Sequence, residues 1–341
     1  MCIYKYLVRL TPIDTYFFGG ETTFGNNTKQ NYYVKSNKLP QVSTLLGTMR
    51  YEILRQRDLL FPLKEGRTKR EVVDAIGEKG FDMSPNHYGI IKEISPLFIE
   101  NKNAGAFYTS LPLDYGIKVH KTNIKCSFSS TTTCEYAYAA EGYDMKKYDN
   151  YRYWTDNKKN KVDDGDIFYQ KEQVGITKNG KSDDDKDAYY KIITYGLRSG
   201  YNFIFMLTTS EELKESDTIT YMGGNRSAFK MQVSEISGED KEKIGDSFTE
   251  YFSSLHEDGR FLLLGDAFFS DEEIDRLPFF WAESICNRYV VTKQNVSGVS
   301  WKEPDKTKAL YRLLKRGGVI YSDEKLQCED YLTNVGLNIF I

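Results

Sequence analysis

Residues 11–50 combine glycines, aromatic side chains and arginine in a pattern that suits contact with a sugar-phosphate chain. Glycine permits close approach of a backbone, aromatic rings stack on bases, and arginine pairs with phosphates. The candidates are Gly19, Gly20 and Gly25, the aromatic residues Tyr16, Phe17, Phe18, Tyr32 and Tyr33, and Arg50. The alternative is an ordinary strand, loop and core helix, because glycines and aromatics are common in β-rich folds.

The same stretch predicts a helix that begins at Ser43, where a serine side chain can cap the first turn. Apolar residues then recur at helical spacing at Leu46, Met49 and Ile53. Other positions form a separate stripe, which comprises Ser43, Gly47, Arg50 and Arg57. One stripe can therefore pack against a core while the other holds phosphates.

A second basic segment near the C-terminus offers another possible phosphate site. Its basic residues are Lys293, Lys302, Arg312, Lys315 and Arg316, and they are followed by Gly317 and Gly318. Backbone amides at a Gly-Gly step, together with neighbouring basic side chains, can bind phosphate. A hairpin with a charged outer face explains the same residues equally well.

The charge distribution favours a nucleic-acid partner more than the total does. The net charge of the 341 residues is −3, but residues 28–70 sum to +7 and residues 288–316 to +6. Phosphate binding depends on local charge, so these basic blocks in an acidic chain favour contact with RNA or DNA. The blocks need not lie on one face.

The composition predicts a globular protein of one or two domains in the cytoplasm. Hydrophobic residues make up 40% and charged residues 28% of the chain. Five cysteines without a C-x-x-C pair argue against a disulfide framework or a zinc site. The chain has no signal-peptide core and no apolar run of the roughly 18 residues that a membrane span needs.

The order of the predicted elements indicates an α+β fold with mostly antiparallel sheets and helices on one face of each. We expect a strand at residues 4–10, a strand buried on both faces at residues 201–207, and a tight Gly-Gly turn at residues 222–226. Ile244, Phe248, Phe252 and Leu255 mark an amphipathic helix. Residues 131–169 resemble an insertion, either a protruding arm or a surface loop.

The sequence predicts no catalytic activity, cofactor or metal, although two patterns suggest alternatives. Residues 175–182 match the P-loop formula G-x-x-x-x-G-K-S, but the acids of residues 183–187 would repel a triphosphate and the next segment favours a strand. His120 lies between Lys118 and Lys121 and could act as the base of a metal-independent ribonuclease. The P-loop NTPase and the ribonuclease therefore remain alternatives.

The order of several short motifs resembles one protein family. The motifs are PIDTYFFGGETTFG, LPQVSTLLGTMR, ISPLFI, LPLD, EQVGI, MGGNR and SGVSWKEPDKTKALYRLLKRGGVIY. Together they resemble the third subunit of the Cmr effector complex of type III-B CRISPR systems, which is one of the repeat-associated RAMP proteins. The resemblance runs from about residue 12 to residue 321.

This resemblance implies two ferredoxin-like, RNA-recognition-like modules, here expected at residues 1–170 and 171–341. It also implies a subunit without catalysis, which holds the 5′ handle of the CRISPR RNA together with the large polymerase-like subunit and beside backbone RAMP subunits. An arm, within residues 131–169 or 25–38, would wedge into the duplex of guide and target RNA. A handle-binding role in another type III complex remains an alternative.

The resemblance also points to individual RNA-binding positions. They are Asp14, Phe18 and Gly20 in the first loop, Ser43, Thr44, Gly47 and Arg50 in the helix, Gly223, Gly224 and Arg226 in the Gly-Gly turn, and Arg316, Gly317 and Gly318 near the end. Two departures affect single contacts: Gly19-Gly20-Glu21 replaces a basic Arg-Asp-Gly, and residues 315–318 replace a Pro-Ala-Gly-Ser-like step.

Overall fold

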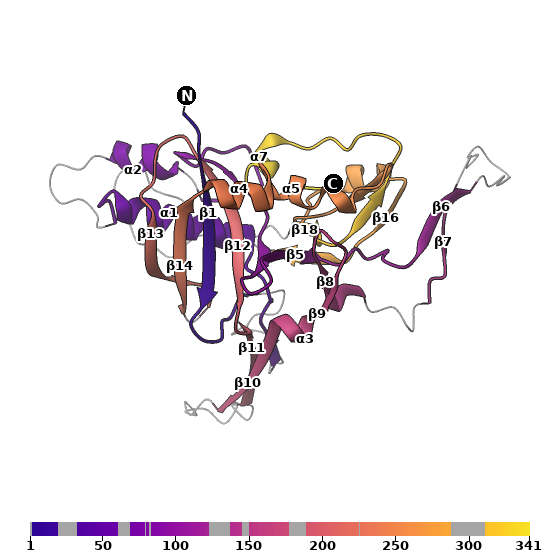
Figure 1. Cartoon of the computed structure of the whole chain (residues 1–341), viewed down its shortest axis with the longest axis horizontal. Helices are drawn as coiled ribbons and strands as arrows, with labels where there is room; N and C mark the ends of the chain where they lie inside the picture. Colours follow the sequence, from indigo (N-terminus) through magenta and orange to yellow (C-terminus); the bar gives the residue numbers. More distant parts are fainter. Residues whose placement is uncertain are drawn as a thin grey trace, which may run out of the picture.

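The computed structural model describes residues 2–19, 33–60, 69–78, 80–81, 83–122, 137–144, 150–176, 189–224, 226–287 and 311–341. A nine-stranded sheet forms its centre (Figure 1). The strand order is β13 (Ser216–Met222), β14 (Ser227–Glu235), β1 (Tyr4–Pro12), β12 (Tyr201–Thr209), β4 (Phe98–Asn101), β5 (Ala106–Ser110), β8 (Tyr153–Thr155) and β9 (Lys161–Asp163), and β3 (Ile91–Ile94) also pairs with β12. Every pairing in this sheet is antiparallel.

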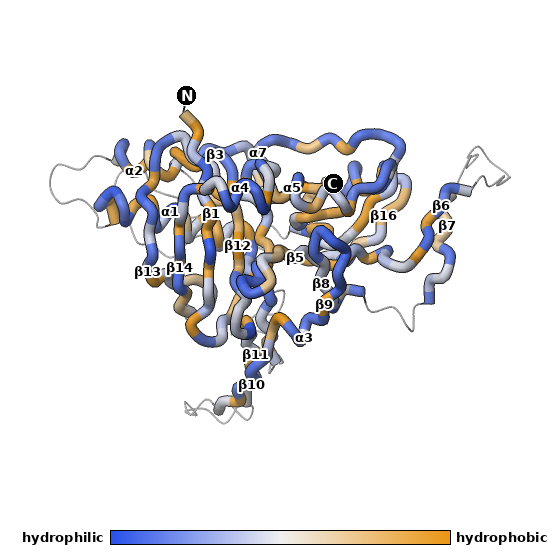
Figure 2. Tube along the Cα trace, in the orientation of Figure 1, coloured by the Kyte–Doolittle hydropathy of each residue, from blue (hydrophilic) through white to orange (hydrophobic). Residues whose placement is uncertain are grey.

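Two predicted strands lie at the centre of this sheet. The N-terminal strand is β1, which pairs with β12 on one side and β14 on the other. The apolar run at residues 201–207 is β12, in which every residue after Tyr201 is buried. Figure 2 shows hydrophobic residues concentrated along β1 and β12, whereas helix α4 (Gly238–Ile244) is mainly hydrophilic. Both strand predictions are confirmed.

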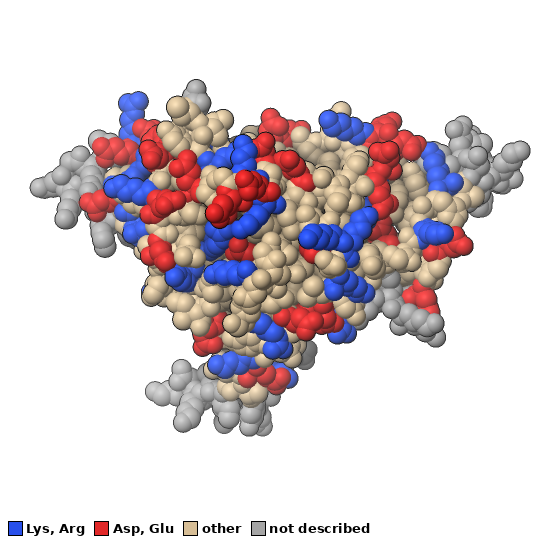
Figure 3. Space-filling view, in the orientation of Figure 1, with Lys and Arg blue, Asp and Glu red and all other residues tan. Residues whose placement is uncertain are grey.

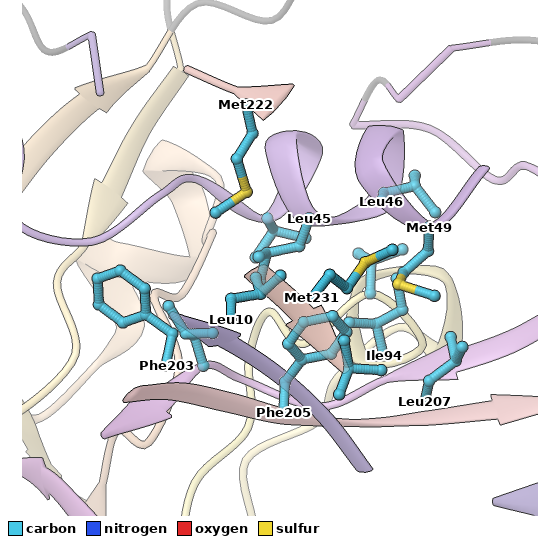
Figure 4. Packing of buried hydrophobic residues seen from close by; sticks show 14 of the residues in the cluster. Leu10, Leu45, Leu46, Met49, Ile94, Phe203, Phe205, Leu207, Met222 and Met231 are labelled. Carbon is cyan, nitrogen blue, oxygen red and sulfur yellow. The ribbon is translucent and has the colours of Figure 1, made fainter. Parts of the chain in front are cut away.

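Helix α1 (Val42–Gln56) covers one face of the sheet. Leu45, Leu46 and Met49 point from the helix towards the strands, where they meet apolar side chains of β1, β12 and β14 (Figure 4). Phe229, Met231 and Val233 alternate along β14 and all face this core, as their period of two predicts. Helix α2 (Lys69–Ile76) packs beside α1 and ends at Gly77, which has a φ of +80°.

The opposite face of the sheet is covered by three short helices in place of the single predicted helix. They are α4, α5 (Phe248–Tyr251) and the 3₁₀ turn η2 (Ser253–Leu255). Gly245 has a φ of +76° and ends α4, and the Ser247 side chain accepts a hydrogen bond from the amide of Glu250 to begin α5. The prediction of one helix was therefore wrong, although its apolar positions are all buried.

The C-terminal part adds two small sheets. Strands β15 (Arg260–Leu262), β19 (Val319–Tyr321) and β16 (Phe279–Trp281) form one of them, and β17 (Ser284–Asn287) pairs with β18 (Tyr311–Leu314) in the other. Helix α6 (Asp271–Arg276) begins with a capping box formed by Ser270 and Glu273. Helix α7 (Asp330–Thr333) lies near the C-terminus.

Two hairpins extend from the body of the molecule (Figure 1). One consists of β6 (Lys118–Thr122) and β7 (Ala137–Glu141). The other consists of β10 (Phe168–Ile176) and β11 (Tyr189–Leu197), to which β2 (Tyr33–Lys35) adds in parallel. Between the hairpins in sequence, the predicted insertion also contains η1 (Asn150–Arg152) and α3 (Asp164–Ile167), while residues 123–136 and 145–149 lie outside the described part.

The predicted α+β class with mostly antiparallel sheets is confirmed, with few helices. The predicted boundary between residues 170 and 171 falls inside β10, and the nine-stranded sheet takes strands from both sides of it; the division into two modules stays a prediction. Among the described helices, none has the length and hydropathy that crossing a bilayer requires.

Candidate nucleic-acid interface

The first loop and the Gly-Gly turn lie directly against each other, although about 200 residues separate them in sequence. The amide of Gly224 donates to the carbonyl oxygen of Phe17 at 2.7 Å. Gly223 has a φ of +78°, and a Cβ added there would lie 2.5 Å from that oxygen and 2.9 Å from the Phe18 ring. Glycine is therefore required at position 223, because any side chain would force the two segments apart.

The N-terminal half of α1 lies beside the same turn. The hydroxyl of Thr48 contacts the sulfur of Met222, the last residue of β13, at 3.7 Å. In Figure 4 Met222 lies over the helix near Leu45. We call the combined region the loop–helix–turn surface, defined as residues 14–19, 42–47, 223–224 and 226.

The helix begins one residue earlier than predicted, and its cap differs. Gln41 occupies the N-cap position without a capping side-chain bond, so Ser43 lies within the first turn and the prediction of a Ser43 cap was wrong. Ser43 and Thr44 are half-buried, while Gly47 is exposed with open space around it. The amides of Val42 and Ser43 precede the first intrahelical hydrogen bonds, and a helix start of this kind favours anions.

Tyr16 and Phe18 do not offer ring faces to bases, which corrects the expectation of stacking. Their side chains are 0% and 3% exposed and pack against Phe203 and Phe229 in the core. The Tyr16 hydroxyl donates to the carbonyl oxygen of Lys38 at 2.8 Å, and burial raises the pKa of Tyr16 well above its usual value. These two rings hold the first loop in place instead.

Other predicted residues of this surface remain accessible. Asp14, Gly19 and Arg226 are exposed, and the Asp14 carboxylate accepts a hydrogen bond from the amide of Thr15 at 2.7 Å. Arg226 has a φ of +51°, a left-handed conformation that non-glycine residues seldom adopt and that often marks functional positions. Gly20 and Lys293 lie outside the described residues.

Lys35 and Lys38 add positive charge beside the surface, and neither was singled out from the sequence. Lys35 is exposed, and a hydrogen bond with the Tyr195 hydroxyl raises its pKa, so it is charged at neutral pH. Lys38 forms an ion pair with Asp164. A signal was present in the sequence, since both lysines directly precede the helix that was expected to bind phosphate.

Arg50 is partly buried on the side of α1 that faces α2. One of its terminal nitrogens donates to the carbonyl oxygen of Gly77 at 3.3 Å, while its Nε is buried without a hydrogen-bond partner among the described residues. Burial lowers the pKa of Arg50. The side chain therefore joins α1 to the end of α2 rather than extending over the loop–helix–turn surface.

The second Gly-Gly step is buried, so the expected phosphate site there is not formed. The amides of Gly317 and Gly318 donate to the carbonyl oxygens of Leu263 and Lys315, at 2.8 and 3.1 Å. Arg316 is 7% exposed; its guanidinium donates to the carbonyl oxygen of Leu97 at 2.7 Å, and its amide to Asp266 at 3.0 Å. These groups connect the C-terminal sheets to the nine-stranded sheet.

Arg312 is exposed on β18. It pairs with Cys286 in the register of β17 and β18, and the next pair is Asn287 with Tyr311. The side chain of Asn287 accepts a hydrogen bond at 2.9 Å from Gln41, the N-cap of α1. Because side chains alternate along a strand, Arg312 lies on the other face of β17–β18 from Asn287 and does not point to the helix start.

Charges of both signs are interspersed over the face of the molecule drawn in Figure 3, with no single basic band. Parts of both basic blocks, residues 28–32, 61–68 and 288–310, lie outside the described residues. The positive charge of the loop–helix–turn surface and its margin thus comes from a few described residues, namely Lys35, Lys38 and Arg226, while Asp14 is negative.

The residues set aside as chemical candidates lie elsewhere. Gly175 and Ile176, the first two residues of the P-loop formula, end β10, and residues 177–188 lie outside the described part. The strand predicted after them is confirmed as β11. His120 is exposed on β6. In the described ranges, no three His, Cys, Asp or Glu side chains gather as a metal site would require.

Comparison with protein families gives one match that spans nearly the whole chain. The model of the CRISPR-associated protein family Cas_Cmr3 matches residues 8–336. The chain belongs to this family. The resemblance to the third Cmr subunit is thereby confirmed, and Cas_Cmr3 membership makes the chain a subunit of a type III-B Cmr effector complex.

Solved structures give weaker matches. Two chains at 13% identity come from cryo-EM structures of the type III-B Cmr-beta complex bound to cognate target RNA, one also with AMPPnP. Each match covers 93% of this chain and 86% of the other, with TM-scores of 0.49 and, with AMPPnP, 0.48. A chain of the apo complex matches at 8% identity over 69% of this chain and 98% of its own, with a TM-score of 0.31. No curated protein matches significantly.

Proposed function

We propose that this Cas_Cmr3 chain is a non-catalytic subunit that binds the repeat-derived 5′ handle of CRISPR RNA through the loop–helix–turn surface. The carrying observation is that three segments predicted separately as RNA contacts meet there, held by a glycine whose Cβ would lie 2.5 Å from the Phe17 oxygen. Such a surface needs only to position a strand, so binding requires no proton transfer or metal.

The proposed contacts follow from the groups that remain available. Arg226 is exposed and can pair with phosphates, and the first amides of α1 favour negative charge. Tyr33 is 48% exposed at the edge of the β10–β11 hairpin and can stack on an unpaired base. Tyr16, Phe18, Arg316, Gly317 and Gly318 serve the fold in this scheme.

The proposal includes protein partners and an arm. We assign the arm that enters the guide–target duplex to the β10–β11 hairpin, because its base is held by the Lys38–Asp164 ion pair and by a hydrogen bond of 3.0 Å from the Trp154 ring nitrogen to Asp164. The large polymerase-like subunit and the backbone RAMP subunits dock around it in the cytoplasm, and target RNA passes near the guide start.

A ferredoxin-like module is also part of this proposal. Such a module begins with a strand, a helix and a hairpin, and the hairpin lies next to the first strand in the sheet. The order β13-β14-β1, with α1 following β1 in sequence, agrees with that first half. A second module would comprise the small C-terminal sheets.

The experiment is purification of the tagged chain from its native host with a photo-crosslinking residue at position 226. A matched chain carries the same residue at Arg276, an exposed site on α6. We expect short RNAs with a common 5′ handle, co-purification of the large subunit, and crosslinks to the handle from position 226 alone. Recovery of the complex with equal or absent crosslinks at both positions would disprove the proposed contact surface.

A metal-independent RAMP endoribonuclease remains the alternative, since His120 is exposed on β6. Incubating precursor CRISPR RNA with the purified chain and with a His120→Ala variant separates the two. We expect no cleavage by either protein. Cleavage that disappears with His120→Ala would establish the enzyme instead.

A further inference from the structure

A cavity of about 660 Å³ opens at the base of the β6–β7 hairpin, away from the residues assigned to the CRISPR RNA handle. Its walls come from residues 112–121, the turn at residues 156–160, the turn before β15, and the end of β19. A volume of this size suits a ligand as large as a single nucleotide. The chemistry of its walls indicates which ligand fits.

Two of the four acidic side chains of the cavity, Asp114 and Asp323, are paired with cations of the protein. Asp114 accepts two hydrogen bonds from Arg260, at 2.6 and 2.7 Å, and another from the Tyr321 hydroxyl. Asp323 pairs with Lys121, and Asp258 lies 3.6 Å from His256. Glu257 remains, and it interacts electrostatically with Arg260.

Three other side chains of the lining have no carboxylate partner of this kind in the described part. No ion pair joins Lys118, His120 or Lys159 to a carboxylate in the ranges that the structure covers, and all three line the cavity. Lys118 lies opposite Glu141 in the hairpin register without forming an ion pair. The lining thus holds four acidic and four basic side chains, and Lys118 and Lys159 are its two cations without an ion pair in the described ranges, so they can bind a phosphate group.

Lys159 is held in an unfavourable backbone conformation that points to a function. Its φ is +63°, a left-handed value that asparagine or glycine adopts more readily than lysine. The Asp156 carboxylate builds this turn by accepting hydrogen bonds of 2.9 Å from the amides of Lys158 and Asn160, and one of 2.7 Å from the Asn160 side chain. A residue that opposes its local geometry is expected mainly at functional sites.

An aromatic ring and a carboxylate complete the features of a nucleotide site. Tyr115 is 44% exposed, and its carbonyl accepts a hydrogen bond of 2.8 Å from Asn150, which fixes the backbone that carries the ring. The Lys161 amine lies 5.7 Å from the centre of this ring. An exposed tyrosine can stack on a base, and the Glu257 carboxylate can accept hydrogen bonds from ribose hydroxyls.

We propose that this cavity binds a ribonucleotide, with the phosphate at Lys118 and Lys159 and the base against Tyr115. The ligand is either a free nucleoside monophosphate or one nucleotide of an RNA strand, because both present the same groups. This site is separate from the loop–helix–turn surface.

The test titrates the purified full chain with AMP by calorimetry and with a labelled RNA octamer by fluorescence anisotropy. Lys159→Asn removes the charge and places asparagine in a conformation that it tolerates, so the variant should melt at or above the wild-type temperature. Lys158→Asn is the matched control, because Lys158 is exposed in the same turn and does not line the cavity. Lys118→Ser tests the opposite wall.

Weakening of AMP binding by about fivefold or more with Lys159→Asn and Lys118→Ser, but not with Lys158→Asn, supports a site for the free nucleotide. The same pattern with the octamer, without AMP binding, supports a site for an RNA strand. The proposal would be overturned if the variants bound each ligand as tightly as wild type does, or if the wild type bound neither ligand. Arg226→Asn should leave AMP binding unchanged, which keeps this result independent of the handle proposal.

Discussion

The two Gly-Gly turns of this protein have similar local sequences and opposite surroundings. Gly223 and Gly224 are followed closely by Arg226, which is exposed, whereas Arg316 directly precedes Gly317 and Gly318 and is buried. Both turns contain a glycine with positive φ, +78° at Gly223 and +83° at Gly317. In the first turn the arginine faces solvent, and in the second it joins two parts of the fold.

The difference arises from the segments that pack around each turn. Gly317 lies against Ser110, and a Cβ added there would come within 2.8 Å of the Ser110 Cβ, so the second turn is enclosed by β5. The first turn contacts the loop before Gly19, while Gly223 itself remains exposed. A Gly-Gly step beside an arginine therefore indicates that another group comes close to the glycine backbone. Whether that group is protein or ligand depends on whether neighbouring strands cover the turn.

Arg316→Ala should give the largest effect, a loss of about 3–5 kcal/mol in the free energy of unfolding, because it removes a buried guanidinium from the Leu97 carbonyl and from the partly buried Asp266 carboxylate. Urea unfolding measures the loss. Arg312→Ala in the neighbouring strand, where the side chain is exposed, should change stability by about 0.5 kcal/mol or less. Similar stability of both variants would contradict the structural role of the second turn.

Gly223→Ala should cost about 3 kcal/mol or more, because the new methyl group combines a left-handed backbone with a clash against the Phe17 carbonyl. Gly259→Ala provides the matched control: its φ is +71°, but the nearest atom to an added Cβ is 3.7 Å away, so about 1 kcal/mol is expected. Thermal unfolding compares the two. Equal losses would mean that the first loop does not press on the turn.

Glu52→Gln should cost about 1–2 kcal/mol at neutral pH. The buried Glu52 carboxylate accepts hydrogen bonds from Arg55, from Gln56 and from Ser216 of β13, the strand that leads to the first turn. Burial acts to raise its pKa, but these hydrogen bonds outweigh burial and lower the pKa. A lowered pKa in the folded state stabilises the protein above the unfolded pKa of about 4.3.

The contribution of Glu52 is lost as the pH falls through its folded pKa. The free energy of unfolding, measured between pH 7 and pH 3, should therefore differ less and less between wild type and Glu52→Gln as the pH falls. Glu71→Gln, at an exposed position of α2, should show little difference at any pH. If the difference in the free energy of unfolding stays constant or widens towards low pH, the pKa of Glu52 is not lowered in the folded protein.

The strands could be predicted because their signals are local. The alternation in β1, the apolar run of β12 and the Gly-Gly turn before β14 each lie within a few residues. The break at Gly245 was also readable, since a glycine followed by Ser247 is an ordinary helix stop and start. These parts depend on neighbours in sequence.

The burial of predicted site residues depends on distant segments and could not be read from the sequence. Tyr16 is enclosed because Lys38 and Phe229 reach it, and Arg316 because Leu97 and Asp266 do. Long-range pairing also brings β12 and β14 from the second half of the chain beside β1. Composition shows which residues can bind RNA, while long-range packing decides which of them are exposed.

The most direct test of the handle-binding proposal is the salt dependence of RNA affinity in the assembled complex with wild-type, Arg226→Asn and Arg276→Gln chains. Asparagine tolerates the left-handed conformation of position 226, so the fold should persist. We expect Arg226→Asn alone to weaken handle RNA binding about tenfold and to reduce the slope of log affinity against log salt by about 0.7, the value for one lost phosphate contact on a single strand. A wild-type slope and affinity for Arg226→Asn would contradict RNA binding at the exposed turn.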